Sequence, residues 1–191
     1  MNFFTKNSGK NFVHFDSYDK YTDKISAIYY HFLWSRIQRT KNTTVRAILN
    51  FMENFSLRLQ RILGIHRNFY TGANWFSITH ELASDFVANQ DKMLKIIRYT
   101  VSSDEHVLAT FLRIAASKDY KFYSTSDNDY NAIMRLIDWE RGNPYVWKID
   151  NLDEIKESRM LFARKFDENI DNEIIEKIIR MFSYKQDKEL K

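Results

Sequence analysis

Two carboxylates and an imidazole, those of Asp104, Glu105 and His106, follow two serines in the segment YTVSSDEHVLAT. A carboxylate in such a place can take the proton of an attacking hydroxyl and act as a general base. The same residues also fit a helix start, because Ser102 and Glu105 have the spacing of a capping box. Asp104 in the first turn would in addition favour the helix dipole. From the spacing alone, the helix cap is the favoured interpretation.

A second acidic group has the form of a metal site. Asp127 and Asp129 flank Asn128 in the loop Ser124–Asp129, and paired carboxylates can hold a divalent cation. Asp and Asn are also ordinary turn residues, and a turn explains this serine-rich loop without a metal. The five histidines have no ligand spacing and the chain has no cysteine. The sequence therefore supports no zinc site and excludes a cysteine nucleophile.

Three tryptophans, Trp75, Trp139 and Trp147, lie near predicted strand ends or turns. An exposed indole can stack on the apolar face of a sugar ring and bury a large area. Tryptophan is also largely buried on average in folded proteins. The residues alone favour burial for at least two of the three.

The pattern of apolar residues predicts alternating strands and helices in a chain of 191 residues, which fits one domain with a sizeable core. Four glycines and one proline leave no visible flexible linker. We expect an α/β or α+β class with strands over residues 74–79, 132–139 and 160–166. The expected helices cover residues 80–89 after a Thr79 cap, 92–99, a stretch from Ser102 or Ser103, and 151–158 with a capping box at Asn151 and Glu154. Asp171 is expected to cap the last helix, which runs to residue 180.

The segment of residues 36–67 is basic and carries a helical apolar stripe. Its bases face one acid, Glu53, and are Arg36, Arg39, Lys41, Arg46, Arg58, Arg61 and Arg67. The stripe repeats at spacings of three and four and consists of Val45, Ile48, Leu49, Met52, Phe55, Leu59, Ile62 and Leu63. The favoured interpretation is a helix packed on the core with a solvated basic face. Docking on an anionic membrane is the alternative, ranked above nucleic acid because no nucleic-acid motif is present.

Four motifs follow one another along the chain: GANWFSITHE (Gly72–Glu81), SSDEHVLATFL (Ser102–Leu112), NAIMRLIDWERGNP (Asn131–Pro144) and LFARKFDENID (Leu161–Asp171). Together they resemble the core-2/I-branching glycosyltransferases. That family includes β-1,6-N-acetylglucosaminyltransferases, peptide O-xylosyltransferases and many bacterial surface-polysaccharide enzymes. The resemblance extends over most of the chain, from about residue 6 to residue 178.

The resemblance implies a GT-A-type fold with a mixed sheet flanked by helices. It implies inverting transfer of N-acetylglucosamine or a related sugar from a UDP-sugar to a glycan hydroxyl, with no metal or other cofactor. Relatives carry a nucleotide-binding portion upstream of the segment that resembles residues 1–16, so we expect this chain to be the C-terminal part of such an enzyme. The alternative to an active enzyme of bacterial surface polysaccharide synthesis is a truncated remnant that at most binds an acceptor glycan.

The resemblance also assigns roles near the acceptor. Glu105 takes the place of the catalytic base, and we expect amide hydrogen bonds at the helix start to lower its pKa and keep it ionised. Trp139 matches a tryptophan that lines the acceptor site, with Trp75 and Asp104 expected around it. His106 is a further supporting neighbour of Glu105.

For the diphosphate, the resemblance implies basic side chains in place of a metal. Lys165 matches the lysine of the family's clamp. The second base is expected to be Arg141, or more weakly Arg164, because Tyr145 follows Pro144 where many relatives have an arginine. The expected partners are thus a UDP-sugar and a glycan acceptor.

The N-terminus lacks a signal-peptide core, and no window of the sequence approaches a membrane span. We therefore expect a cytoplasmic chain, with residues 36–67 as the segment that would contact the inner face of the membrane.

Overall fold

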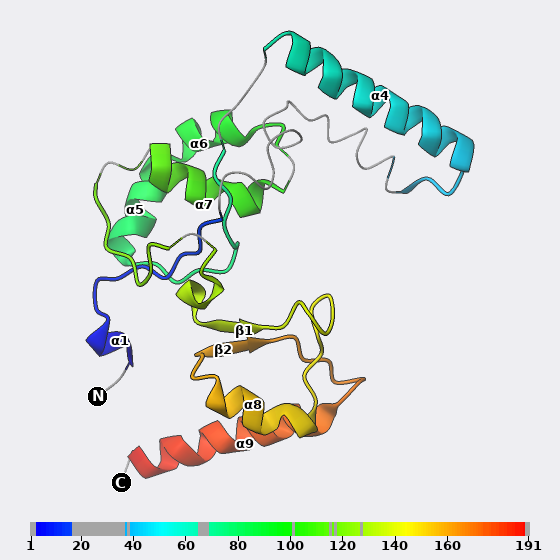
Figure 1. Cartoon of the computed structure of the whole chain (residues 1–191). Helices are drawn as coiled ribbons and strands as arrows, with labels where there is room; N and C mark the ends of the chain where they lie inside the picture. The colour runs from blue at the N-terminus through cyan, green and yellow to red at the C-terminus, as the bar shows by residue number, and fades with distance from the viewer. Residues whose placement is uncertain are drawn as a thin grey trace. The chain divides into compact units, whose positions relative to one another are not determined.

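The computed structural model describes residues 3–16, 37, 39–64, 69–100, 102–114, 116, 118–126 and 128–189. The chain divides into two compact units, Met1–Ile133 and Met134–Lys191, which we call unit 1 and unit 2. Helices occur in both units, and a small parallel sheet lies in unit 2 (Figure 1). The expected mixture of helices and strands is thereby confirmed. The one-domain organisation of residues 1–191 stays a prediction.

The described helices of unit 1 are α1 (Phe3–Lys6), α4 (Thr43–Ile62), α5 (His80–Ala88), α6 (Gln90–Ile97), α7 (Ser103–Ile114) and the 3-10 helix η2 (Tyr130–Ile133). The predicted helices over residues 80–89 and 92–99 are confirmed as α5 and α6. Thr79 caps α5 as predicted, because its hydroxyl accepts a hydrogen bond from the Leu82 amide at 3.3 Å.

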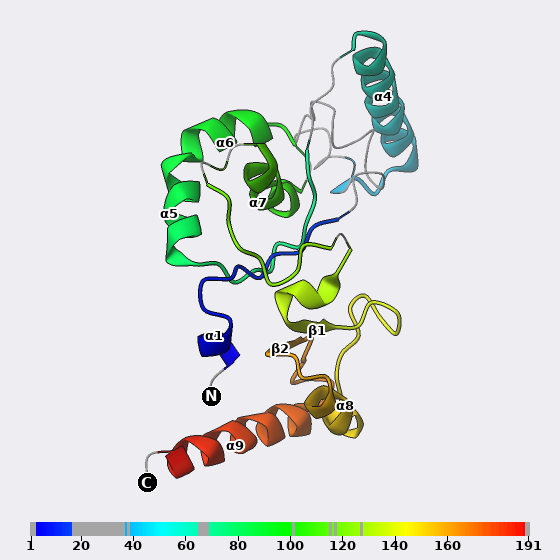
Figure 2. The same cartoon turned by 60° about the vertical axis from the view of Figure 1, so that its left-hand side comes forward.

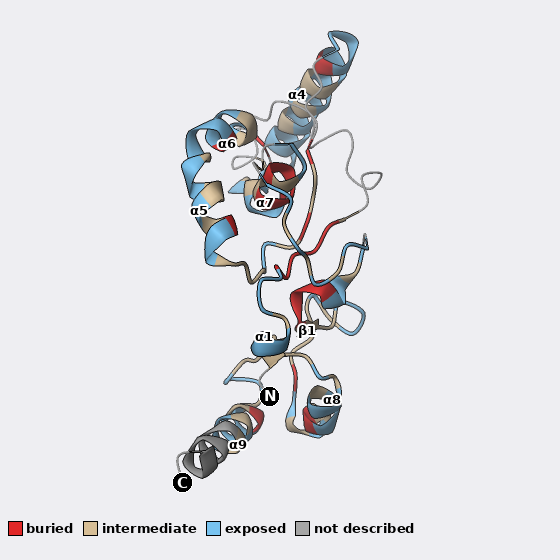
Figure 3. Cartoon of the chain, turned by 90° about the vertical axis from the view of Figure 1, so that its left-hand side faces the viewer, coloured by how far each residue is buried: buried red, intermediate tan, exposed pale blue. Residues whose placement is uncertain are grey.

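Helices α5, α6 and α7 lie next to one another in unit 1 (Figure 2), and their apolar side chains contribute to its core. Its buried members are Val13, Phe15, Leu82, Met93, Leu108, Ala109 and Phe111. The spacing of three between Leu108 and Phe111 puts both on one side of α7. One side of α7 is thus fixed in the core, as its burial shows in Figure 3, while Asp104 and Glu105 in its first turn stay exposed.

The predicted strand over residues 74–79 is wrong as a strand, since only an isolated antiparallel bridge forms between Ser77 and Phe12. The reason is that segment 11–16, which contains Phe12, pairs with residues 74–79 at one residue and with a different chain segment at the next. Asn11 pairs with Phe122 in a parallel bridge on the other side. Its side-chain oxygen also accepts the Thr79 amide at 2.8 Å. Segment 11–16 therefore connects two chain segments without extending a ladder to either.

Unit 2 contains the strands β1 (Arg135–Ile137) and β2 (Phe162–Arg164), the 3-10 helix η3 (Ile149–Asn151) and the helices α8 (Leu152–Glu157) and α9 (Asn172–Glu189). The strands pair in parallel, with Leu136 opposite Ala163. Both lie inside predicted strands, but Ala132 and Ile133 belong to η2 instead. Among the described residues the sheet is two-stranded and parallel, so the expected mixed sheet is not what this part of the chain forms.

One of the two predicted caps in unit 2 is confirmed. The Asp171 carboxylate accepts the Ile174 amide at 3.2 Å and starts α9. It also accepts the Ile149 amide at 2.9 Å, and these amide bonds, that of Ile149 first, lower the pKa of Asp171. The predicted capping box of Asn151 and Glu154 is wrong, because the Asn151 side-chain oxygen accepts the backbone amide of Lys148, three residues earlier, instead.

Helix α4 corrects the expectation of a core-packed apolar stripe. Seven of the eight residues of the predicted stripe are exposed, from 43% at Val45 to 81% at Ile62, while Leu49 is half-buried. Figure 3 shows most of α4 in the exposed colour. Asn42 caps the helix, since its side-chain oxygen accepts the amides of Thr44 and Val45. Among the described residues, no helix is long and apolar enough to cross a bilayer.

Candidate active site

The first turn of α7 presents the carboxylates of Asp104 and Glu105 at the surface of unit 1. The helix starts at Ser103, because Ser102 has a left-handed φ of 50° and its carbonyl accepts the Glu105 amide at 2.9 Å. Two acids in a first turn are also stabilised by the helix dipole. The side-chain half of the predicted capping box stays a prediction.

A chain segment running from Phe69 to Asn74 is hydrogen-bonded along α7. Thr110 anchors one end, since its hydroxyl accepts the Tyr70 amide at 3.0 Å and donates to the Tyr70 carbonyl at 3.2 Å. At the other end, the side-chain amide of Asn74 donates to the Asp104 carboxylate at 2.8 Å. The orientation of the first turn of α7 is therefore fixed by this segment as well as by the core.

Gly72 lies at the centre of that segment, and its amide donates to the Glu105 carbonyl at 2.9 Å. A Cβ at this position would stand 2.1 Å from the carbonyl oxygen of His14. Because backbone atoms cannot move aside as a flexible side chain can, only glycine lets segment 11–16 approach so closely. The glycine of the first motif thus holds Glu105 beside His14 and Asp16.

The pKa of Glu105 is raised, which corrects the expectation of a lowered one. Partial burial is the largest cause, followed by the charges of Asp104 and Asp16. The expectation assumed amide hydrogen bonds to the carboxylate, whereas the contacts seen at Glu105 run through its backbone groups. Burial and neighbouring negative charge both disfavour the ionised form. A carboxylate with a raised pKa is the stronger proton acceptor.

His14, Asp16 and Tyr130 complete the cluster and were not anticipated from the sequence. The buried His14 ring stacks on Tyr130 at 4.1 Å between centroids. Its Nδ1 accepts the Ala73 amide at 3.2 Å, and its Nε2 lies 3.5 Å from Asp16. The Tyr130 hydroxyl also reaches Asp16 at 3.5 Å. No local signal could reveal the cluster, since about ninety positions separate Asp16 from Glu105 and only the tertiary fold joins them.

His106 is a buried polar partner within the same cluster. Its Nδ1 lies 3.1 Å from the hydroxyl of Thr71. Burial, the largest cause, lowers the pKa of His106, against opposing effects of a hydrogen bond to the Tyr70 backbone and of Asp104 and Asp16. A neutral His106 therefore stands beside the carboxylates at neutral pH.

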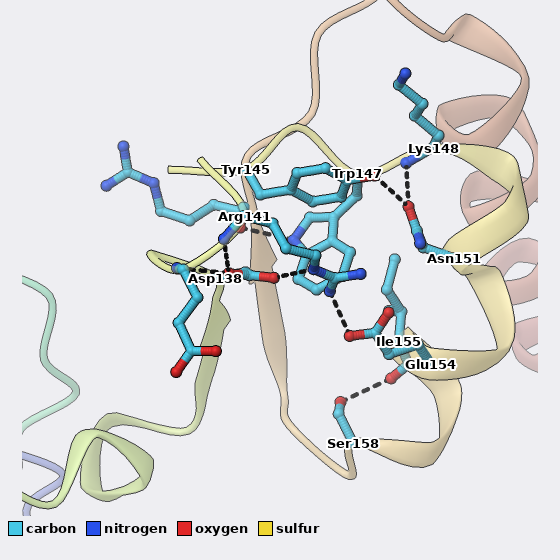
Figure 4. Close-up of polar contacts among 11 residues, drawn as sticks. Asp138, Arg141, Tyr145, Trp147, Lys148, Asn151, Glu154, Ile155 and Ser158 are labelled. Atoms are coloured by element: carbon cyan, nitrogen blue, oxygen red, sulfur yellow. Dashed lines mark hydrogen bonds and ion pairs between the residues drawn. The ribbon is translucent and has the colours of Figure 1, made fainter. Parts of the chain in front are cut away.

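Arg141, a predicted diphosphate ligand, lies in unit 2 and is bound to carboxylates (Figure 4). Its guanidinium donates to Asp138 and to Glu154. It also lies 4.6 Å from the ring centre of Tyr145 and 5.1 Å from that of Trp147. The Asp138 carboxylate accepts the Glu140 and Arg141 amides as well, and the bonds from Arg141 lower its pKa. Arg141 thus ties the loop after β1 to α8.

The other two predicted bases follow each other at the end of β2. The Arg164 carbonyl accepts the indole N–H of Trp147 at 2.7 Å, and the Lys165 backbone pairs with Tyr145 and Trp147. This pairing fixes the backbone at Lys165. Among the described residues, the half-buried Lys165 side chain makes no ion pair. Its ammonium group is the one better placed to accept an anionic ligand.

The tryptophans separate into one core residue and two surface residues. Trp147 is 1% exposed, whereas Trp75 and Trp139 are 41% and 53% exposed. The expectation that at least two of the three are buried is therefore wrong, because the hydrogen-bonded strand ends enclose only Trp147. Exposed indole faces are what stacking on a sugar requires.

The structure thus brings Asp104 and Glu105 together in unit 1, where Trp75 also lies, and places Trp139, Arg141, Arg164 and Lys165 in unit 2. In the parts of the chain that the structure describes, no three carboxylate or imidazole groups are arranged to hold a metal ion. The Asp127 to Asp129 prediction falls partly outside the described residues. Asp129 accepts the Asn131 amide at 3.0 Å, as a turn residue does.

Residues 7–160 match the sequence model of the core-2/I-branching enzymes. The chain belongs to the core-2/I-branching enzyme family. Members of this family are glycosyltransferases, and sugar transfer is the activity that membership implies. No curated protein and no solved structure matches the chain.

The match to the branching-enzyme family contains three of the four motifs named from the sequence, including those with Glu105, Trp139 and Arg141. The fourth motif, with Arg164 and Lys165, begins just after the matched residues. The role of Lys165 therefore depends on its motif and on its geometry in unit 2.

Proposed function

We propose that the chain transfers N-acetylglucosamine or a related sugar from a UDP-sugar to a glycan hydroxyl with inversion, and that Glu105 is the catalytic base. The observation that carries the proposal is the environment of Glu105. Glu105 lies at the surface, and its pKa is raised by the partial burial of its carboxylate first and then by the charges of Asp104 and Asp16. Family membership supplies the reaction class.

In the proposed reaction, the acceptor hydroxyl attacks the anomeric carbon of the donor sugar as Glu105 takes its proton. The bond from that carbon to the diphosphate oxygen breaks, and UDP leaves. The raised pKa of Glu105 lies closer to neutral pH than that of an ordinary glutamate, and a general base is most effective when its pKa is near the working pH. Asp104 and Asp16 raise this pKa by repulsion, and the Asn74 bond keeps Asp104 in place.

The negative charge that develops on the leaving diphosphate needs neutralisation, and Lys165 is the proposed group. Arg141 would have to exchange Asp138 or Glu154 for the phosphate, so its proposed contribution is the smaller one. We propose no metal for this step. The exposed faces of Trp139 and Trp75 support a role in stacking on the acceptor sugar.

A GT-A-type fold and bacterial surface polysaccharide as the product derive from the motif resemblance and are further parts of the proposal. A cytoplasmic location is also proposed. Binding of an acceptor glycan without transfer is the alternative. The two differ in one measurement, because only a transferase consumes UDP-sugar in the presence of an acceptor.

The test compares Glu105→Gln with Glu81→Gln. Both remove one negative charge from the first turn of a helix in unit 1. Release of UDP from UDP-N-acetylglucosamine is measured against a panel of glycan acceptors. We expect Glu105→Gln to lower the turnover about 10²- to 10⁴-fold, and Glu81→Gln to leave it near the wild-type value.

Full turnover by Glu105→Gln would rule out Glu105 as the base while leaving the family assignment intact. Saturable glycan binding by the wild type without any UDP release would instead favour the binding-only alternative.

A further inference from the structure

Helix α4 turns its apolar side to the solvent. Six side chains spaced three or four residues apart are between 44% and 81% exposed, namely Ile48, Phe51, Met52, Phe55, Leu59 and Ile62. Residues with this spacing lie along one side of a helix. An exposed apolar stripe of this length on a folded chain marks an interaction surface.

The covered side of α4 is mixed in character. Gln60 is buried, and Leu49, Glu53, Ser56 and Leu57 are half-buried. The Gln60 side chain donates to the Ser56 hydroxyl at 3.2 Å. Amphipathic helices of globular proteins normally bury the apolar side and expose the polar one. In α4, six large apolar side chains are exposed instead, so that this side of the helix offers a surface to an apolar partner.

The charges around the stripe indicate what that partner is. Among the described residues of the segment 36–67, the exposed bases are Arg39, Lys41, Arg46, Arg58 and Arg61. The one acid of the segment is the half-buried Glu53. Arg58 lies seven residues after Phe51 and four before Ile62, so it flanks the stripe directly. A long basic side chain in this position can place its alkyl stem on an apolar phase and its charge at an anionic headgroup.

We propose that α4 docks in the plane of a bilayer surface that contains anionic lipids, with its apolar stripe inserted among the acyl chains. Basic amphipathic helices with aromatic residues on the apolar side bind membranes in this way. Phe51 and Phe55, whose rings stack at 6.5 Å between centroids, would enter the boundary together. A second copy of the chain is a poorer occupant, because it would bring Arg58 and Arg61 against like charges.

This inference does not depend on the transfer reaction, and it is tested by binding to vesicles. The full chain is sedimented with phosphatidylcholine vesicles and with vesicles in which about a third of the lipid is phosphatidylglycerol. We expect binding to the anionic vesicles, weakened by added salt, and at least about tenfold less binding to the neutral ones.

Two matched double variants separate the apolar stripe from net charge. Phe51→Asp with Phe55→Asp puts two acids on the stripe. Asn50→Asp with Asn54→Asp puts two acids with the same spacing on the neighbouring exposed polar side, about 100° around α4. Circular dichroism checks that both variants keep their helices. We expect the phenylalanine variant to bind anionic vesicles at least about tenfold more weakly than the asparagine variant.

Equal binding of the two variants would overturn the proposal, as would failure of the wild type to bind anionic vesicles. A wild-type dimer that the phenylalanine variant abolishes, seen by analytical ultracentrifugation without vesicle binding, would overturn it in favour of self-association.

Discussion

At the scale of single residues, the environment of Glu105 decides its chemistry. Spacing alone gives a helix cap with a lowered pKa, whereas the folded chain surrounds Glu105 with Asp104 and Asp16 and raises its pKa. The difference arises because amide hydrogen bonds would favour the ionised form, while partial burial and like charge disfavour it.

This environment predicts the pH dependence of transfer. The base must be ionised, so activity falls as the pH drops through the pKa of Glu105, and a raised pKa puts this acid limb at a higher pH than for an ordinary glutamate. Removing a repelling charge with Asp104→Asn should lower that pKa and move the limb of kcat/KM to lower pH. Asp91→Asn, in the first turn of α6, is the control and should leave the limb in place. A limb that stays in place in both variants would argue against Glu105 as the titrating base.

The two proposed phosphate ligands, Lys165 and Arg141, should differ in whether their replacement lowers catalysis or stability. Lys165→Ala should lower kcat/KM about 10²-fold, as loss of a group that stabilises developing charge does, with Tm unchanged. Arg141→Gln should lower Tm because it removes the contacts to Asp138 and Glu154, with a smaller effect on transfer. Thermal unfolding measures the Tm of the two variants, and steady-state kinetics measure their kcat/KM. The reverse pattern would make Arg141 the diphosphate ligand.

At the scale of elements, the site depends on segments packed on α7. The segment Phe69–Asn74 and segment 11–16 bring Asp16 and His14 to the helix start, and Gly72 permits the approach. Thr110, His106 and Asp104 of α7 each form a side-chain hydrogen bond with the segment Phe69–Asn74. These bonds explain why the exposed start of α7 is held in a defined position.

Gly72→Ala tests this packing. The new Cβ would overlap the His14 carbonyl, so the segments must separate, at a cost of about 3 kcal/mol in the free energy of unfolding. Gly9→Ala is the control, because no atom lies within 4 Å of its Cβ position and only its left-handed φ of 77° is unfavourable. It should cost about 1 kcal/mol. Urea unfolding measures both, and equal losses would show that the close approach at Gly72 is not needed.

At the scale of the whole molecule, the basic charge of the chain and the exposed apolar side of α4 both favour binding to an anionic membrane. The chain has a net charge of +4, and the segment that includes α4 concentrates bases beside an exposed apolar stripe.

An enzyme that this helix holds on a membrane would meet lipid-linked acceptors in two dimensions, which raises their local concentration. Transfer to a lipid-linked acceptor should therefore respond to the phenylalanine variant of α4 more strongly than transfer to a soluble one.

The sequence by itself determined the features that depend on neighbouring residues. Helices α5 and α6, the Thr79 and Asp171 caps and the amphipathic pattern of α4 follow from local spacing, because helices close their hydrogen bonds within one segment. The four motifs in their order along the chain were likewise sufficient to predict the family.

Only the tertiary structure decided the features that join distant segments. The strand predicted at residues 74–79 became one bridge, since a ladder needs a partner of matching length, and segment 11–16 supplies one residue of pairing. The exposure of the α4 stripe, the burial of Trp147 but not Trp139, and the Asp16 charge beside Glu105 likewise depend on which surfaces the fold covers. Composition and spacing specify which side chains are available, whereas burial and long-range contact specify which charges they meet.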